Sequence, residues 1–180
     1  MNSIEDGTGS GYKAQVDASN RLRARSVTEP YDKAVNTEGS QWSAYFTVTP
    51  TGAGDYFFYV KNTGVNDLLI SDVRIMCASP DTFTYEEVSG TPTGGTTLTP
   101  VNRNFGSAKQ ISGTVETGVD ITGLTSEGTV FFERCDTANK RYKLSTTSNI
   151  IIPQGSAFAI KAATGTALVT CVVSLTEAVI

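Results

Sequence analysis

The chain has 180 residues, of which 39% are hydrophobic and 18% charged, and its formal net charge is −4. This composition excludes a mostly disordered chain and a membrane-spanning helix, and the negative charge argues against nucleic-acid binding over the whole surface. The first eleven residues, MNSIEDGTGSG, lack the basic and apolar regions of a signal peptide. We therefore expect no Sec-type export, and one domain with an appendage.

Residues 1–40 are polar, carry charges of both signs and show no sustained periodicity, which predicts an extended, partly flexible N-terminal arm. Within it, the stretch VDASNRLRARSVTEP (16–30) has an arginine at every second position. Side chains two residues apart share a face of extended backbone, so the arginines would share one face, opposite the leucine between them. The candidate partner-binding residues of this basic ribbon are Lys13, Arg21, Leu22, Arg23 and Arg25.

Two interpretations of the basic ribbon stay open. The ribbon could lie on another subunit, where backbone hydrogen bonds give affinity and the arginines pair with acidic groups. Alternatively, the arginines could protect an exposed edge strand from edge-to-edge aggregation.

From residue 41 to the end, short β-branched and aromatic runs alternate with Gly, Pro, Asn and Asp at intervals of about ten residues, which is typical of an antiparallel sandwich or barrel. We predict an all-β fold, a single antiparallel β-sandwich or jelly-roll-like domain over 41–180, with at most one or two short helices. The expected strands are 42–49, 55–62, 67–78, 82–88, 109–117, 129–135, 141–146, 149–153, 156–162 and 167–175.

Alternating apolar positions predict the core of this domain. Trp42 begins one alternating strand and is expected in the core. The segments 55–62 and 129–135 have aromatic residues on both faces, which predicts central strands or strands whose outer face meets another chain. The residues expected to be mostly buried are Phe46, Val48, Phe58, Val60, Leu69, Ile75, Val130, Ile151, Phe158, Ile160, Val169 and Val173.

Catalytic signatures are few. The sequence has no histidine, the commonest general base and metal ligand. The three cysteines, Cys77, Cys135 and Cys171, are widely separated without a CxxC spacing, and we expect buried packing thiols.

Paired carboxylates give no clear acid/base site either. Glu86 and Glu87 are neighbours, so on a strand they would point to opposite faces. The remaining acids near strand ends fit no calcium loop and are expected to be solvated turn residues: Asp67, Asp72, Asp120, Glu127 and Asp136. We predict no metal, no cofactor and no enzymatic activity.

Three phrases carry a resemblance to a known class of proteins: VDASNRLRARSVTEPYDKAVNTEGSQWSAYFTV, FFYVKNTGVNDLLISDVRI and NIIIPQGSAFAIKAATGTALVTCVVSL. In texture they resemble structural proteins of tailed-bacteriophage virions, in particular head decoration (cement) proteins. The resemblance implies a β-sandwich or jelly-roll module, often trimeric, that clamps neighbouring capsomers through extended arms and has no enzymatic activity. The resemblance covers most of the chain, but individual residues carry over only in the arm, at Arg21, Arg23 and Arg25, and it offers no catalytic positions.

The predicted function is therefore a virion structural protein, assembled in the host cytoplasm, that stabilises a phage capsid lattice and docks through its N-terminal arm. The expected partners are the major capsid protein or other virion subunits and further copies of the chain, as a homotrimer, with no nucleic acid and no membrane. The alternative is a glycan- or receptor-binding module of a phage tail or head fibre.

Overall fold

The computed structural model describes residues 3–5, 13–16, 22–23 and 31–178. Internal contacts divide the chain into two units, Met1–Tyr31 and Asp32–Ile180. The first unit contains a small antiparallel sheet in the order β1-β2-β3. Its strands are β1 (Ser3–Glu5), β2 (Lys13–Val16) and β3 (Leu22–Arg23).

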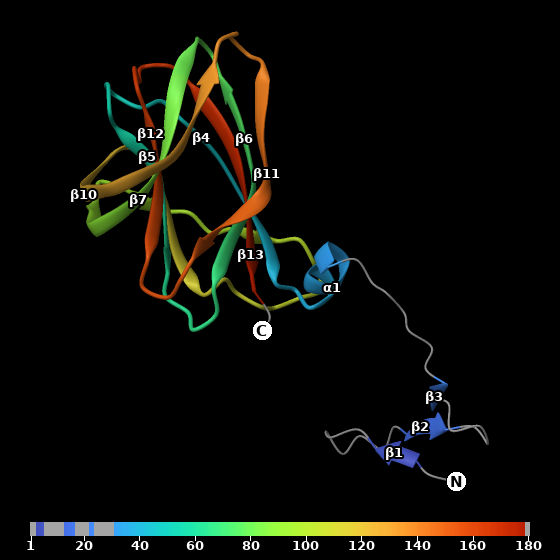
Figure 1. Cartoon of the computed structure of the whole chain (residues 1–180). Helices are drawn as coiled ribbons and strands as arrows, with labels where there is room; N and C mark the ends of the chain where they lie inside the picture. The colour runs from blue at the N-terminus through green and yellow to red at the C-terminus, as the bar shows by residue number, and fades with distance from the viewer. Residues whose placement is uncertain (1–2, 6–12, 17–21, 24–30, 179–180) are drawn as a thin grey trace. The chain divides into compact units, whose positions relative to one another are not determined.

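The second unit consists of two antiparallel sheets packed face to face, and the short helix α1 (Tyr31–Thr37) leads into it (Figure 1). One sheet has the order β11-β6-β13-β4-β9 and the other β5-β12-β7-β10-β8. The strands are β4 (Gln41–Val48), β5 (Tyr56–Asn62), β6 (Leu68–Cys77), β7 (Asp81–Thr93), β8 (Thr96–Thr97), β9 (Val101–Asn102), β10 (Gly113–Cys135), β11 (Arg141–Ile152), β12 (Ala157–Ala162) and β13 (Val169–Glu177).

Along the chain, successive strands among the eight longer ones lie in different sheets at every step except from β7 to β10, and the first, β4, pairs with the last, β13. This connectivity is that of a jelly roll, in which every sheet neighbour comes from a distant part of the sequence. The predicted all-β antiparallel sandwich is confirmed.

The main core lies between the inner faces of the two sheets. Phe46 of β4 stacks on Phe58 of β5 with ring centroids 5.3 Å apart, and Phe57 meets Phe83 of β7 edge-on. Trp42 is 1% exposed, so its predicted place in the core is confirmed. The three cysteines are also buried, as predicted.

Two of the twelve residues predicted to be buried are not. Val130 is 51% exposed and Ile151 is 58% exposed, whereas the other ten are buried. Val130 is the extra residue of a β-bulge, because its neighbours Thr129 and Phe131 pair with consecutive residues of β7. In β11 it is Ile152 that is buried in the core, and alternation turns Ile151 outward.

Strand β10 is longer than predicted and pairs with two strands. The separate strands expected at 109–117 and 129–135 are parts of one strand, Gly113–Cys135, which begins after residue 112. Its first part pairs with β5 and its second part with β7. Since β12 lies between β5 and β7, these pairings close the sheet on itself.

A second, smaller core lies on the side of this sheet away from the main core and contains Tyr59, Val88, Ile121, Ala157 and Ala159.

The curl of the β7–β10 ribbon depends on two glycines. Gly90 and Gly123 have φ values of +102° and +78°. A Cβ at Gly90 would lie 2.3 Å from the carbonyl oxygen of Gly123, and a Cβ at Gly123 would lie 2.4 Å from that of Thr91. Only glycine fits such a close backbone approach at these angles.

Two further expectations need correction. The strands predicted at 141–146 and 149–153 form one strand, β11, interrupted by a register shift between Ser145 and Ile150. Strand 55–62 is central, with β10 and β12 as neighbours, as predicted. Segment 129–135 pairs with β7 alone among the described residues, so the interpretation as a central strand is wrong, and an outer face that meets another chain stays a prediction.

The buried thiols should be inert in the folded protein. Burial raises the pKa of Cys135 to about 12 and also raises those of Cys77 and Cys171, and the thiolate is the reactive form. We expect no thiol to react with Ellman's reagent at pH 8 in native protein and all three to react after denaturation. Rapid labelling of one thiol in native protein would contradict this packing.

Candidate interaction surface

The most exposed apolar groups of the sandwich include side chains where the edge strands of its two sheets come together. One of these strands is the second part of β10 and the other is β11, and among the described residues neither has a partner strand on its outer side. Val130 and Ile151 are exposed here, and Phe132 of β10 is 68% exposed. We refer to Val130, Phe132, Ile150, Ile151 and Phe158 as the open edge.

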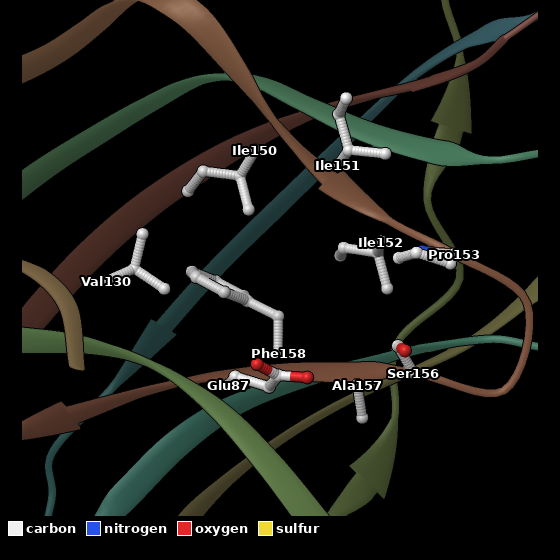
Figure 2. Close-up of a pocket in the computed structure, with 9 residues that line it drawn as sticks. All are labelled: Glu87, Val130, Ile150, Ile151, Ile152, Pro153, Ser156, Ala157 and Phe158. Carbon is white, nitrogen blue, oxygen red and sulfur yellow. The ribbon is translucent and has the colours of Figure 1, made fainter. Parts of the chain in front are cut away.

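A hollow of about 290 Å³ lies at the open edge. Figure 2 shows side chains of β11, β12 and β10 around this space. Ile150 packs against the main core and Phe158 is only 2% exposed, so the hollow is where the space between the sheets opens to the surface. It is lined by Glu87, Val130, Ile150, Ile151, Ile152, Pro153, Ser156, Ala157 and Phe158.

Glu87 gives the apolar hollow an acidic border. Its partner Phe158 on β12 faces the main core, so Glu87 is on the same face of the sheet but at its open end, where it is exposed. Glu87 also lines a neighbouring hollow of about 260 Å³ together with Glu127. The open edge is therefore apolar in its middle and negatively charged on one side.

Glu86, the neighbour of Glu87, is directed to the opposite face, as predicted, but it is 2% exposed. Lys161 Nζ lies 2.5 Å from its Oε1, and Tyr56 donates a 2.5 Å hydrogen bond to its Oε2. Burial alone would raise the pKa of Glu86, but hydrogen bonds from Lys161 and Tyr56 outweigh it and lower the pKa. Burial and the same carboxylate raise the pKa of Tyr56.

This cluster is structural in character. Both oxygens of Glu86 are engaged, by Lys161, Tyr56 and a long contact with the Thr129 hydroxyl. A carboxylate that acts on a substrate must present a free oxygen to it. The arrangement instead joins β5, β7, β10 and β12 on the side of the second core.

The predicted basic ribbon is only partly within the described residues. Lys13 lies in β2 opposite Glu5 of β1, and Leu22 and Arg23 form β3, opposite Val16 and Gln15 of β2. The structure thus places Lys13, Leu22 and Arg23 in neighbouring strands of one small sheet. Arg21 and Arg25 lie outside the described residues.

The open edge was not identified from the sequence as a site. The available signal was the aromatic pair in TVFFERC, for which an outer face meeting another chain was one of two interpretations. Several acids expected in turns also lie elsewhere: Asp120 and Glu127 are within β10, and Asp72 is within β6.

Comparison with protein-family models, with curated proteins and with solved structures found no match. Within the described residues, no helix has the length and apolar character needed to cross a membrane. The same part of the chain contains no group of three or more Cys, Asp or Glu side chains arranged to hold a metal ion.

Replacing Lys161 should show the structural role of Glu86. Lys161→Met leaves a buried carboxylate without its cation. We expect the free energy of unfolding at pH 7 to fall by about 3 kcal/mol, which is the low end of the range for buried ion pairs, because Lys161 is 28% exposed. The pKa of Glu86 is lower in the folded than in the unfolded protein. Its ionised carboxylate therefore contributes to the free energy of unfolding above the unfolded pKa of about 4.3, and this contribution is lost as pH falls through the folded pKa.

Urea unfolding at pH 7 and pH 3 measures the difference in free energy of unfolding between the parent protein and Lys161→Met, and this difference should be smaller at pH 3. Lys140→Met is the matched control at an exposed lysine and should change stability by less than about 0.5 kcal/mol. Equal stability of Lys161→Met and the parent protein at pH 7 would show that the pair contributes nothing.

Proposed function

We propose that this protein is a non-enzymatic structural subunit of a tailed-bacteriophage virion, a decoration protein that self-associates and attaches to the capsid lattice. The observation that carries the proposal is the open edge: an apolar hollow between two edge strands of a jelly roll, each of which lacks a partner on its outer side within the part of the chain that the structure describes. The sequence resemblance to head decoration proteins points in the same direction.

The open edge supports association between copies of the chain. Unpaired strand edges with exposed apolar side chains promote association with other chains, and proteins usually cover them, bend them or charge them. Here the exposed side chains at the centre are uncharged, and Val130, Phe132 and Ile151 are each more than half exposed. A second copy covers this surface in our proposal, and a homotrimer is the assembly that we expect.

The N-terminal unit supports attachment to the lattice. Internal contacts separate Met1–Tyr31 from the sandwich, and this unit carries the basic ribbon. Many copies on a closed shell would add avidity to modest individual contacts.

Removing the charges of the basic ribbon should weaken attachment. We expect the change of Arg21, Arg23 and Arg25 together to glutamine to reduce affinity for undecorated phage heads by roughly two to five orders of magnitude if all three form charge-assisted hydrogen bonds at a buried contact. The far-UV circular dichroism of the sandwich should be unchanged. Co-sedimentation with heads, beside light scattering of the free protein, measures both properties. Retained binding together with new aggregation would support edge protection instead of docking.

Polar substitutions at the open edge should separate the copies. Val130→Ser with Ile151→Ser removes two side chains that are exposed in the single chain, so folding should be preserved. The loss of apolar burial should cost about 2 kcal/mol of binding free energy at each interface between two copies, which corresponds to a roughly 30-fold weaker association. Sedimentation equilibrium should show a shift from trimer to monomer, whereas the control Val65→Ser, at an 83% exposed residue, should leave the mass unchanged. A parent protein that is monomeric at all concentrations would rule out self-association.

A further inference from the structure

The outer face of the sheet β11-β6-β13-β4-β9 is basic, although the chain as a whole is acidic. Arg74 of β6 lies opposite Lys143 of β11, and Arg141 lies two residues before Lys143 on the same strand. Arg103, directly after β9, extends over this face and donates hydrogen bonds to the hydroxyls of Ser43 and Ser174. We refer to Arg74, Arg103, Arg141 and Lys143 as the basic face.

A β-bulge in β6 places the carboxylate of Asp72 among these cations. Ser174 and Leu175 of β13 pair with Asp72 and Ile70 of β6, which leaves Ser71 as an extra residue. Ser71 and Asp72 are therefore both partly exposed, between the buried residues Ile70 and Val73. Bulges redirect side chains in this way at binding sites.

These side chains surround a polar hollow of about 240 Å³. Its charged lining consists of Arg74, Arg103, Lys143 and Asp72, and the remaining lining residues are Gln41, Ser71 and Ser174. Asp72 Oδ2 accepts a hydrogen bond from Arg74 Nε at 2.6 Å. Three cations therefore face one carboxylate, which leaves an excess of positive charge for an anionic ligand.

The other oxygen of Asp72 lacks a hydrogen bond. Asp72 Oδ1 is buried without a hydrogen-bond partner, and the Lys143 ammonium, at 3.8 Å, is too far away to donate one. A buried carboxylate oxygen without a donor is costly, so it favours a ligand that brings a hydroxyl or amide hydrogen. The hollow can therefore bind an anionic group through its arginine and lysine side chains and accept a hydrogen bond from the same ligand at Asp72 Oδ1.

We propose that this hollow binds an acidic saccharide, a sugar that carries a carboxylate beside its hydroxyl groups. The sugar carboxylate pairs with Arg74, Arg103 or Lys143, and a sugar hydroxyl donates to Asp72 Oδ1. Tyr45, 63% exposed, lies on the same row of the sheet as Arg74, with Val172 between them, and offers a ring face to the sugar. This binding activity goes beyond a role in capsid decoration and does not depend on it.

Other anionic ligands fit the hollow less well. Sulfate or acetate has no hydrogen to donate to Asp72, so for these ions the carboxylate is only repulsive. A nucleic acid would need a longer row of cations on a chain whose net charge is −4. The acceptor among the cations is what distinguishes a polyhydroxylated acid from a simple anion.

Matched ligands test the proposal. Methyl β-D-glucuronide, methyl α-N-acetylneuraminide, methyl β-D-glucoside and acetate are titrated into the full chain at low salt, with binding followed by two-dimensional NMR of backbone amides. We expect at least one acidic sugar to bind with millimolar affinity and to shift amides of 71–74 and 103. The glucoside and acetate should bind at least tenfold more weakly. If neither acidic sugar binds, or if acetate binds as well as they do, the proposal is wrong.

Two substitutions locate the site. Arg74→Gln should weaken binding of the acidic sugar about tenfold, in line with loss of a charge-assisted hydrogen bond. Arg134→Gln is the control, because Arg134 also pairs with an aspartate two residues away, Asp136, but elsewhere on the sandwich, and it should have no effect.

Asp72→Asn distinguishes a site for acidic sugars from a general anion site, because the change removes a charge that repels anions and also weakens the hydrogen-bond acceptor. It should weaken binding of the acidic sugar and strengthen that of acetate. An equal gain for both ligands would identify a general anion surface and overturn the assignment. Thermal unfolding of each variant shows that the fold is preserved.

Discussion

The pairing of β10 with two different strands is the constraint on which the rest of the sandwich depends. Because its first part extends the sheet beside β5 and its second part beside β7, the sheet closes on itself and encloses the second core. The closure places Glu86 inside, where the ammonium of Lys161 and the hydroxyl of Tyr56 stabilise its charge. It also leaves the second part of β10 as an edge, with a bulge that turns Val130 outward.

The two sheets consequently have different chemistry on their outer surfaces. The closed sheet uses its outer side for the second core, and its exposed carboxylates, such as Glu87 and Glu127, lie along the β7–β10 ribbon. The other sheet leaves its outer face open to solvent, with the arginines and lysine around Asp72. Charge is thus segregated on one small domain, and local electrostatic docking is possible although the net charge is negative.

Function in such a domain depends on its surfaces. The two proposals use different ones: the open edge for a second copy, and the basic face for an acidic saccharide. Since the open edge is formed by β10 and β11 and Lys143 also belongs to β11, self-association and sugar binding involve different ends of a shared strand, with Ile150 and Ile151 near its last residue and Lys143 near its first. A virion subunit that binds saccharides on its exposed face would be compatible with both.

Much of the fold could be predicted from the sequence, because alternation and turn residues are local signals. Alternation correctly predicted the buried positions of β4 and the burial of Phe158 and Ile160 in β12, but it did not predict that Ala157 and Ala159, on the other face of β12, are buried as well. The bulges could not be predicted, since they depend on pairing with distant strands, and this is why Val130 was assigned to the core. The path of β10 was missed for the same reason: its Gly123 is a turn signal in isolation but a close backbone contact with Gly90 in the structure.

The candidate sites were harder to predict than the fold. The basic ribbon was visible because its arginines are close in sequence, whereas the basic face gathers Arg74, Arg103 and Lys143 from three separate segments. No local pattern connects such residues. Only the sheet order, which brings β11 beside β6 and the segment after β9 across β4 and β13, makes them neighbours.

The central claim is that the open edge is covered by another copy of the chain. Amide hydrogen exchange measured at low and high protein concentration tests it most directly, because unpaired edge strands exchange fast and become protected when they are covered. The account predicts that protection of 129–135 and 150–152 increases with concentration, while that of the central strands β12 and β13 does not change. Equal exchange of both edge segments at all concentrations, in a protein that sediments as an oligomer, would contradict it.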